Sequence, residues 1–180
     1  GFNYTVSNTI VAPTTIDPSD TTYEDACLVI DAPITVTIDG AHRFQCLVLR
    51  GGATLTHSAG SFMELSISSF FSVAADSKID VSGKGLTGPY SGVSGFTGSY
   101  AGGSHGGMGG NGASAVYDSY LNPSKPGSGG YGNQSKGGGV VRIDLGTTGQ
   151  AVIDGRILAN GANSTCCGYG GAAGGSVFLS

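Results

Sequence analysis

The sequence is poor in charge and has no long apolar run. Asp, Glu, Lys and Arg make up 11% of the 180 residues, and only eight residues are Lys or Arg. Nucleic-acid binding needs clustered basic residues, so with a net charge of −4 we expect no nucleic-acid partner. No stretch approaches the roughly 20 apolar residues of a membrane helix, so we expect no membrane span. Disordered chains combine high charge with low hydrophobicity, and this chain has neither property, since 39% of it is hydrophobic.

Helical patterning is also missing. No stretch of a dozen residues shows apolar residues at three- and four-residue spacing while remaining free of Gly, Pro and β-branched clusters. Two-residue alternation is frequent instead, as in Ile34–Ile38, Leu65–Ser68 and Val141–Leu145. These segments are short, and turn-forming Gly, Asp, Asn or Ser residues lie close to them. The sequence therefore predicts an all-β protein.

A short internal repeat narrows the architecture. Cys27–Ile30 recurs as Cys46–Leu49, and the same step along the chain leads on to Leu65–Ser68. We call this spacing, from Cys27 to Cys46, the coil offset, and it also carries Ile34–Thr37 onto Ala53–Thr56. A period near 20 with two short strands in each period is what one coil of a β-solenoid requires. The alternative is a chance echo within a meander or a sandwich, and we favour the solenoid.

The second half of the chain echoes itself at longer spacing. Ser77–Gly83 resembles Gly155–Gly161. Gly138–Ile143 resembles Gly174–Leu179, a spacing close to two coils of about 18 residues each. We therefore expect one solenoid module over residues 1–180. Its predicted parts are N-terminal coils in 1–82, a glycine-rich insertion in 83–139 and C-terminal coils in 140–180.

The predicted insertion holds more than half of the chain's 34 glycines. Tracts of Gly and Ser often act as flexible linkers. This one also carries aromatic residues at irregular intervals, which pure linkers rarely do. We predict an ordered excursion that is packed by its aromatics and threaded through positive-φ turns, which glycine tolerates.

Several motifs carry a resemblance to a known family. They are the turn sequences VSGKG and LANGA, the strand sequences GGGVVRIDL and GGSVFLS, and the glycine blocks Gly102–Gly107, Gly137–Gly139 and Gly174–Ser176, with a less strict block at Gly127–Gly130. From about Ile79 to Ser180 the chain resembles glycine-rich repeats in large extracellular proteins of protists, algae and some bacteria. The resemblance implies a right-handed parallel β-helix of the kind found in adhesins, cell-surface proteins and extracellular filaments.

The four cysteines are Cys27, Cys46, Cys166 and Cys167. Equivalent positions on adjacent coils place Cys27 and Cys46 roughly 5 Å apart, within the Cα range of a disulfide. Adjacent cysteines seldom bond each other, so Cys166 and Cys167 have separate partners, bond to another chain, or bridge back to Cys27 and Cys46. Zinc is the alternative, but vicinal cysteines without a nearby His match no usual structural spacing.

Three N-glycosylation sequons begin at Asn3, Asn133 and Asn163. Together with an even number of cysteines they indicate the secretory route, so we expect an extracellular glycoprotein. The N-terminus has no signal-peptide pattern. The last strand pattern, Ser176–Ser180, stops within an alternation. We therefore expect the chain to be a fragment of a larger protein.

The sequence offers no recognisable catalytic, metal or cofactor site. Most aspartates lie beside turn residues, where Asp bends the backbone. His42, His57 and His105 are isolated in the sequence, and the glycine-rich insertion holds a single acidic residue, Asp118. Calcium-binding nonapeptide repeats would need many more acidic residues. We therefore predict a protein that is not an enzyme and that needs no cofactor.

The leading functional prediction is a structural or adhesive module of an extracellular fibre, coat or appendage. Its expected partners are further copies of itself or neighbouring domains of a larger chain, because the open ends of a solenoid have unpaired backbone groups. The alternative is a carbohydrate- or surface-binding module in which exposed aromatics stack on sugars, with Tyr90, Tyr100, Tyr117 and Tyr120 as candidates. A threonine ladder over Thr35, Thr37, Thr54 and Thr56 raises ice binding as a weaker reading, and polysaccharide degradation is another.

Overall fold

The computed structural model describes residues 5–88, 100–111, 115–131, 135–164 and 170–180. These residues form strands β1 to β12 and contain no helix. Every strand pairing is parallel. The all-β prediction is therefore confirmed, and the strands form two parallel sheets.

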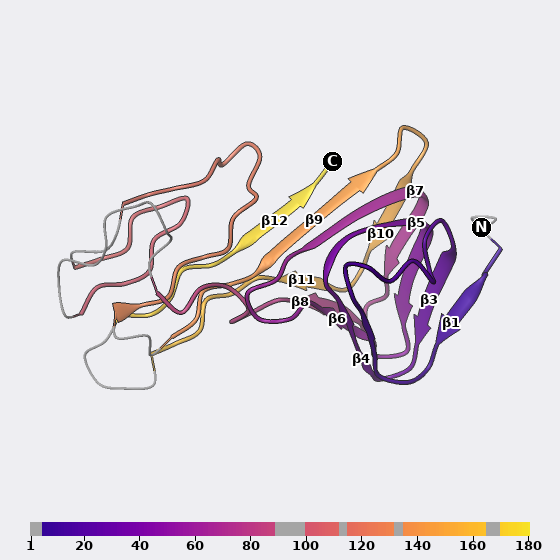
Figure 1. The fold of residues 1–180 in the computed structure, drawn as a ribbon, viewed down its shortest axis with the longest axis horizontal. Coiled ribbons are helices and arrows are strands. Elements are labelled where there is room, and N and C mark those ends of the chain that lie inside the picture. The colour runs from indigo at the N-terminus through magenta and orange to yellow at the C-terminus, as the bar shows by residue number, and fades with distance from the viewer. Residues whose placement is uncertain (1–4, 89–99, 112–114, 132–134, 165–169) are drawn as a thin grey trace.

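The larger sheet, sheet A, has six strands in one path and a seventh that pairs beside it. In spatial order the path is β1 (Asn8–Ile10), β3 (Cys27–Asp31), β5 (Gly40–Arg50), β7 (Met63–Val73), β9 (Val140–Leu145) and β12 (Ser176–Leu179), with β10 (Gln150–Ile153) paired to β7. Sheet B runs in the order β11 (Arg156–Leu158), β8 (Lys78–Asp80), β6 (Thr54–Thr56), β4 (Thr35–Ile38) and β2 (Thr14–Ile16). The long strands β5 and β7 lie in the middle of sheet A (Figure 1).

From β1 to β9 the chain alternates strictly between the two sheets. Odd-numbered strands join sheet A and even-numbered strands join sheet B, and each strand pairs with the next one laid down in its own sheet. As a result β1 and β2 end their sheets on one side, while β11 and β12 end them on the other. Figure 1 shows β1 at the right and β12 farther to the left. Sequence position therefore maps onto position along the stack.

The coil offset is confirmed for one step and wrong for the next. Cys27 pairs with Cys46 across a sequence separation of 19, and Thr35 pairs with Thr54 at the same offset. Cys46 then pairs with Phe70 rather than Leu65. The turn between β6 and β7 holds six residues, while the turn between β4 and β5 holds only one, so this coil is longer. A register shift between Phe44 and Cys46 lengthens it further.

The internal sequence similarities in the second half correspond to paired strands, although the predicted spacing of one pair is wrong. Ile157 pairs with Ile79, and Val177 pairs with Val141, as the sequence echoes imply. The spacing between Gly138–Ile143 and Gly174–Leu179 was predicted to span two coils. The strands β9 and β12 are instead direct neighbours, because β10, β11 and a further glycine-rich stretch lie between them in the sequence.

The main core lies between the two sheets. Inward side chains of sheet A, such as Leu28, Leu47 and Phe71, are fully buried with Val36 and Leu55 of sheet B. Burying apolar area contributes about 25 cal/mol per Å², so this continuous core is the main source of stability. A smaller cluster lies on the opposite face of sheet A and contains Cys27, Val29, Cys46, Val48 and Phe70.

The described residues of 83–139 and 159–175 form a glycine-rich lobe beside the strands, drawn at the left of Figure 1. Its described residues contain no strand, yet their backbones bond to one another. Gly85 N donates to Gly137 O at 2.7 Å, Leu86 N donates to Gly127 O at 3.0 Å, and Gly103 N donates to Gly171 O at 2.9 Å. Residues 159–175, predicted to belong to the C-terminal coils, contribute to this network through Ala162, Gly171 and Ala173. The described part of the lobe is thus a set of extended segments held by main-chain hydrogen bonds.

Close backbone approach, rather than positive φ, explains many of the described glycines of 83–139, although Gly106, Gly107 and Gly110 have open space beside them. Among the described glycines of 83–139 only Gly83 has a positive φ, of 65°. For the described glycines, the expected series of positive-φ turns is therefore wrong. A Cβ added at Gly137 would overlap the backbone of Gly127, and one added at Gly138 would overlap the carbonyl of Ala159. Glycine is needed because neighbouring chains pass within the space of a side chain.

Candidate functional site

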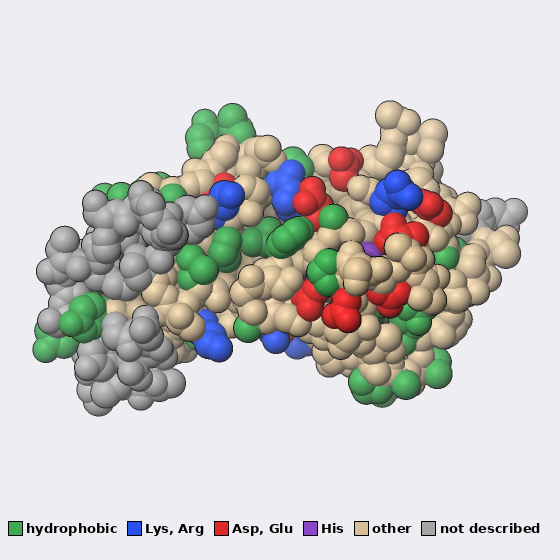
Figure 2. Space-filling view, viewed as in Figure 1, with side chains coloured by type: hydrophobic (Ala, Val, Ile, Leu, Met, Phe, Trp, Pro, Cys, Tyr) green, Lys and Arg blue, Asp and Glu red, His purple; other side chains and the backbone are tan. Residues whose placement is uncertain are grey.

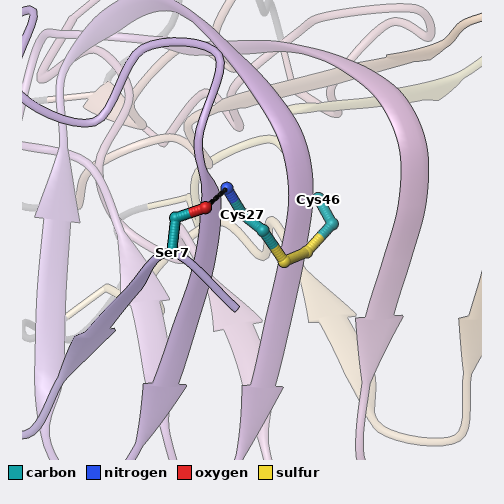
Figure 3. Close-up of a disulfide and its surroundings, with 3 residues drawn as sticks. All are labelled: Ser7, Cys27 and Cys46. Carbon is teal, nitrogen blue, oxygen red and sulfur yellow. Dashed lines mark hydrogen bonds between the residues drawn. A yellow bond between two sulfur atoms is a disulfide. The ribbon is translucent and has the colours of Figure 1, made fainter. Parts of the chain in front are cut away.

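The predicted Cys27–Cys46 disulfide is present in the structure (Figure 3). The two residues are paired on neighbouring strands β3 and β5, with their Cα atoms 4.3 Å apart, and both are fully buried. Ser7 lies beside the bond, and its hydroxyl accepts a hydrogen bond from the Cys27 N–H at 3.4 Å. The disulfide ties adjacent strands of sheet A. Cys166 and Cys167 lie outside the described residues.

One predicted glycosylation site falls on described residues. The Asn163 side chain belongs to an exposed residue of the glycine-rich lobe, although Thr165 of its sequon lies outside the described residues. Asn3 and Asn133 also lie outside them. The predicted attachment of sugar therefore stays a prediction at all three positions.

The four tyrosines proposed for sugar stacking do not share one environment. Tyr117 was predicted to be exposed, but it is only 8% exposed, and its hydroxyl donates to Pro126 O at 2.7 Å. Its ring therefore packs within the lobe, against His105 at a centroid distance of 5.2 Å. Tyr100 and Tyr120 are exposed, at 56% and 86%. Tyr90 lies outside the described residues.

The histidine treated as isolated in the glycine-rich insertion has close polar partners. His105 Nε2 lies 3.0 Å from Asp118 Oδ2 and 3.4 Å from Ser176 Oγ. These are the residue types of a hydrolase triad. In such a triad, however, the carboxylate and the serine bond to opposite ring nitrogens. Here both approach Nε2, and the Ser176 hydroxyl donates to Lys125 O at 2.6 Å. The cluster is arranged to hold a loop.

Asp118 organises that loop through charge-assisted hydrogen bonds. Its carboxylate accepts from the backbone N–H groups of Ser124, at 2.9 Å, and Lys125, at 2.8 Å. Burial favours the neutral acid, but the backbone donors from Lys125, Ser119 and Ser124, together with His105, outweigh burial and lower the pKa of Asp118 to about 2. Sequence spacing gave no signal for this cluster, since Asp118 and Ser176 come from distant segments.

His57 joins the two halves of the fold. It is fully buried, and its Nδ1 lies 2.7 Å from the carbonyl oxygen of Ser58, which can only accept. Nδ1 therefore carries the proton, and the bare Nε2 accepts from Val140 N–H at 3.0 Å. Burial lowers the pKa of His57, and the nearby Lys84 charge adds to this. His57 is thus a neutral connector between the turn before β7 and the start of β9.

His42 also has a structural environment. Its Nδ1 lies 2.8 Å from Glu24 Oε1, and its Nε2 lies 3.1 Å from Asp39 O. The second Glu24 oxygen accepts from Arg43 N–H at 3.0 Å. Both ring nitrogens of this buried imidazole thus face oxygen acceptors of the fold. It offers no bare nitrogen aimed at a substrate.

The described residues contain no group of three or more His, Cys, Asp or Glu side chains arranged to hold a metal ion. They also contain no helix with the length and apolar character needed to cross a membrane.

The predicted threonine ladder has the expected pairing but a limited surface. Thr35 pairs with Thr54, and Thr37 pairs with Thr56. Thr56 is only 7% exposed, and its hydroxyl donates to the Asp80 carbonyl at 2.7 Å. The next residue beyond Thr54 in the column is Lys78, where the coil offset predicted Val73. An extended flat array of exposed threonines is therefore not formed by the described strands.

The β12 end of the stack leaves apolar side chains exposed. Val177 and Leu179 are each 39% exposed. Their paired neighbours on β9, Val141 and Ile143, are fully buried. In the spatial order of sheet A no described strand lies beyond β12. Unpaired backbone groups and exposed core positions thus occur together at this edge.

The charges are distributed unevenly along the stack. Residues 1–42 contain six carboxylates and no Lys or Arg, while residues 78–180 contain six Lys or Arg and four carboxylates. Because sequence position follows position along the stack, the β1–β2 end is acidic relative to the β11–β12 end. In the face shown in Figure 2, most of the acidic side chains gather over the strand-rich half, away from the glycine-rich lobe.

Comparisons with protein-family models, with curated proteins and with solved structures gave no match to this chain.

Proposed function

We propose that the chain is a non-catalytic structural or adhesive module of a secreted glycoprotein, built as a right-handed parallel β-helix. Strict alternation between two parallel sheets supports the helical path, because each return to a sheet adds one strand beside the previous one. The proposed hand follows the strong preference for right-handed crossovers between parallel strands. In this reading sheets A and B are two faces of the coil.

The exposed edge at β12 is the observation that carries the proposal. A strand edge with free N–H and C=O groups is a template for pairing with another chain. Val177 and Leu179 add exposed apolar area at this edge, whereas the residues paired with them on β9 are fully buried. Monomeric proteins usually protect such an edge from pairing by means of charged residues, proline or a covering loop. Ser176–Leu179 contains no charge and no proline.

The occupant we propose for this edge is the β1 edge of a second copy. Both β1 and β12 belong to sheet A and end its strand order, so a second copy can continue the same parallel sheet. The acidic β1–β2 end would then approach the relatively basic β11–β12 end, which favours encounter in this orientation. Head-to-tail contacts of this kind do not close on themselves and generate filaments.

The extracellular location is part of the same proposal. Disulfides persist in oxidising compartments, and Cys27–Cys46 ties the two neighbouring strands β3 and β5. Asn163 is exposed in the lobe and lies outside the strands, so a glycan attached there would not disturb the packing of the two sheets. A low charge content favours this use of sugars, since other solubilising groups are few.

The experiment that tests the proposal is electron microscopy of native material combined with intact-mass analysis of the same sample. Regular filaments or sheets, with sugar mass that is removed by an N-glycosidase, would support a structural glycoprotein. Single unassembled particles without sugar mass would contradict it. Measured turnover of a polysaccharide would contradict the non-catalytic part alone.

A further inference from the structure

A trough lined by exposed side chains runs along the outer face of β7. Phe62, directly before β7, and Glu64, Ser66 and Ser68 of β7 are exposed on this face, while the residues between them are buried in the core. We call this surface the β7 trough. At about 3.3 Å per residue, its floor is roughly 20 Å long.

Taller side chains on the neighbouring strands flank this floor. Arg43 of β5 is paired with Ser66 on one side, and Asp144 of β9 is paired with Ser66 on the other. Arg142 is paired with Glu64, with its Nε 3.9 Å from Glu64 Oε1. Because the small Ser66 lies between the longer side chains of Arg43 and Asp144, the strands form a shallow channel that is open to solvent.

Three adjoining hollows follow this channel. The first, of about 420 Å³, is lined by residues that include Phe62, Glu64 and Arg142. The second, of about 330 Å³, shares Glu64 with the first and includes Arg43 and Ser66. The third, of about 270 Å³, shares Arg43 and Ser66 and includes Asp144. The shared residues show that the hollows adjoin along the strand, and each is close to the lower size of a small-molecule site.

The glycine-rich lobe builds one end of the trough. Asn122, Ser124 and Lys125 line the first hollow opposite Phe62. Arg142 Nη1 donates to Pro123 O at 2.6 Å, and the Arg142 guanidinium lies 4.4 Å from the Phe178 ring centroid. These contacts hold the Arg142 side chain, which is only 20% exposed, in a fixed orientation at the wall. The hollow at this end is therefore preorganised.

We propose that the β7 trough binds an extended, uncharged polysaccharide chain. Phe62 is 45% exposed and supplies an aromatic platform for a sugar ring. Arg43, Glu64 and Asn122 supply planar donors and acceptors for hydroxyl groups along the channel. The lining mixes both signs, with Lys125, Arg142 and Arg43 balanced by carboxylates, so it does not select a polyanion.

This inference is independent of the proposed assembly, because the trough lies on the face of sheet A and not at its end. Of the predicted tyrosines, burial excludes Tyr117 alone, while Tyr100 and Tyr120 are exposed. The binding platform is assigned to Phe62, which sequence reasoning did not select. A single aromatic followed by Glu and Ser in an alternating strand gives no distinctive sequence signal.

The test is retention of the full chain by a panel of uncharged polysaccharides, comprising β-1,4-glucan, β-1,3-glucan, mannan, xylan and chitin, with alginate as the polyanion. Ser66→Tyr should fill the channel and Phe62→Ala should remove the platform, each weakening binding at least tenfold. The matched controls Thr15→Tyr, on an exposed position of sheet B, and Tyr120→Ala should bind like the parent. Circular dichroism would verify that all variants fold.

Three results would overturn the inference. They are no retention by any uncharged polysaccharide in the panel, preferential retention by alginate, and unchanged binding of the folded Ser66→Tyr variant. Loss of binding in Tyr120→Ala instead of Phe62→Ala would move the platform to the lobe and equally reject the trough. Assembly of the variants is scored separately, so failure of binding leaves the assembly result readable.

Discussion

His57 and Val140 are joined by a 3.0 Å hydrogen bond between segments that are far apart in the sequence. Val140 N–H is the donor and the unprotonated Nε2 of the buried imidazole is the acceptor. The contact links the turn before β7 to β9, the first strand after the glycine-rich segment 83–139. It requires a neutral ring, since a protonated Nε2 would face another donor.

Stability should therefore fall in mild acid. The pKa of His57 is lowered in the folded protein, so the unfolded chain binds more protons between that value and about 6.5. The free energy of unfolding should decrease as pH drops below about 6.5, by about 1.4 kcal/mol for each unit by which the folded pKa is lowered. Urea unfolding at a series of pH values measures this. His57→Gln should remove that pH-dependent part, while His42→Gln and His105→Gln should retain it. An unchanged pH profile in His57→Gln would contradict the assignment.

Removing the staple between β3 and β5 should lower stability without loss of fold. The double variant Cys27→Ala/Cys46→Ala removes a cross-link that spans a sequence separation of 19, which corresponds to about 3 kcal/mol in the chain-entropy model. Changing both residues avoids leaving one free thiol. Urea unfolding of parent and variant gives the difference, and the parent in reductant should approach the variant. Equal midpoints for the oxidised parent and the double variant would contradict a stabilising role.

The closely packed backbones of the glycine-rich lobe should reject a methyl group. Gly137→Ala would place its Cβ against the backbone of Gly127, so we expect destabilisation by about 3 kcal/mol or more, or failure to fold. Gly110→Ala is the matched control, because no atom lies within 4 Å of the added Cβ, and its effect should stay within about 0.5 kcal/mol. Thermal unfolding and limited proteolysis compare the two variants. Equal tolerance of both would show that the lobe is not closely packed.

Asp118 should hold its loop only while it is charged. Asp118→Asn weakens the acceptor for the Ser124 and Lys125 N–H groups, and we expect a loss of about 2 kcal/mol. Because the pKa of Asp118 is lowered to about 2, its contribution is present above about pH 4 and is lost as pH falls toward 2. Hydrogen exchange over residues 117–125 measures the local effect. The exposed Asp154→Asn change serves as control, and equal protection in the two variants would contradict this role.

The fold was predictable where local rules repeat and unpredictable where connections change length. Cys27 and Cys46 were recognised because β3 and β5 share apolar residues at a constant offset. The next register was missed because it depends on a six-residue turn and a shift after Phe44, neither of which alters the local alternation. The alternation alone gave all-β structure, since it reports which side chains face a core.

The polar clusters and the β7 trough could not be predicted from the sequence for a different reason. The contacts of Ser176 with His105 and of His57 with Val140 join segments that are distant in the sequence. Glycines that pass close to other backbones carry no side chain whose pattern would reveal which segments are neighbours. Positive φ was therefore the natural expectation for them, although close approach is what the backbone geometry requires.

The most direct test of the assembly claim is sedimentation velocity of the recombinant chain over a concentration series, run beside Leu179→Lys. Leu179 lies at the exposed β12 edge, and Leu121→Lys, at a 72% exposed position in the lobe, is the matched control. We predict that the parent and Leu121→Lys form species larger than one chain as concentration rises, that added salt weakens them, and that Leu179→Lys stays a monomer. A parent that remains monomeric at every concentration, or a Leu179→Lys variant that assembles as the parent does, would contradict it.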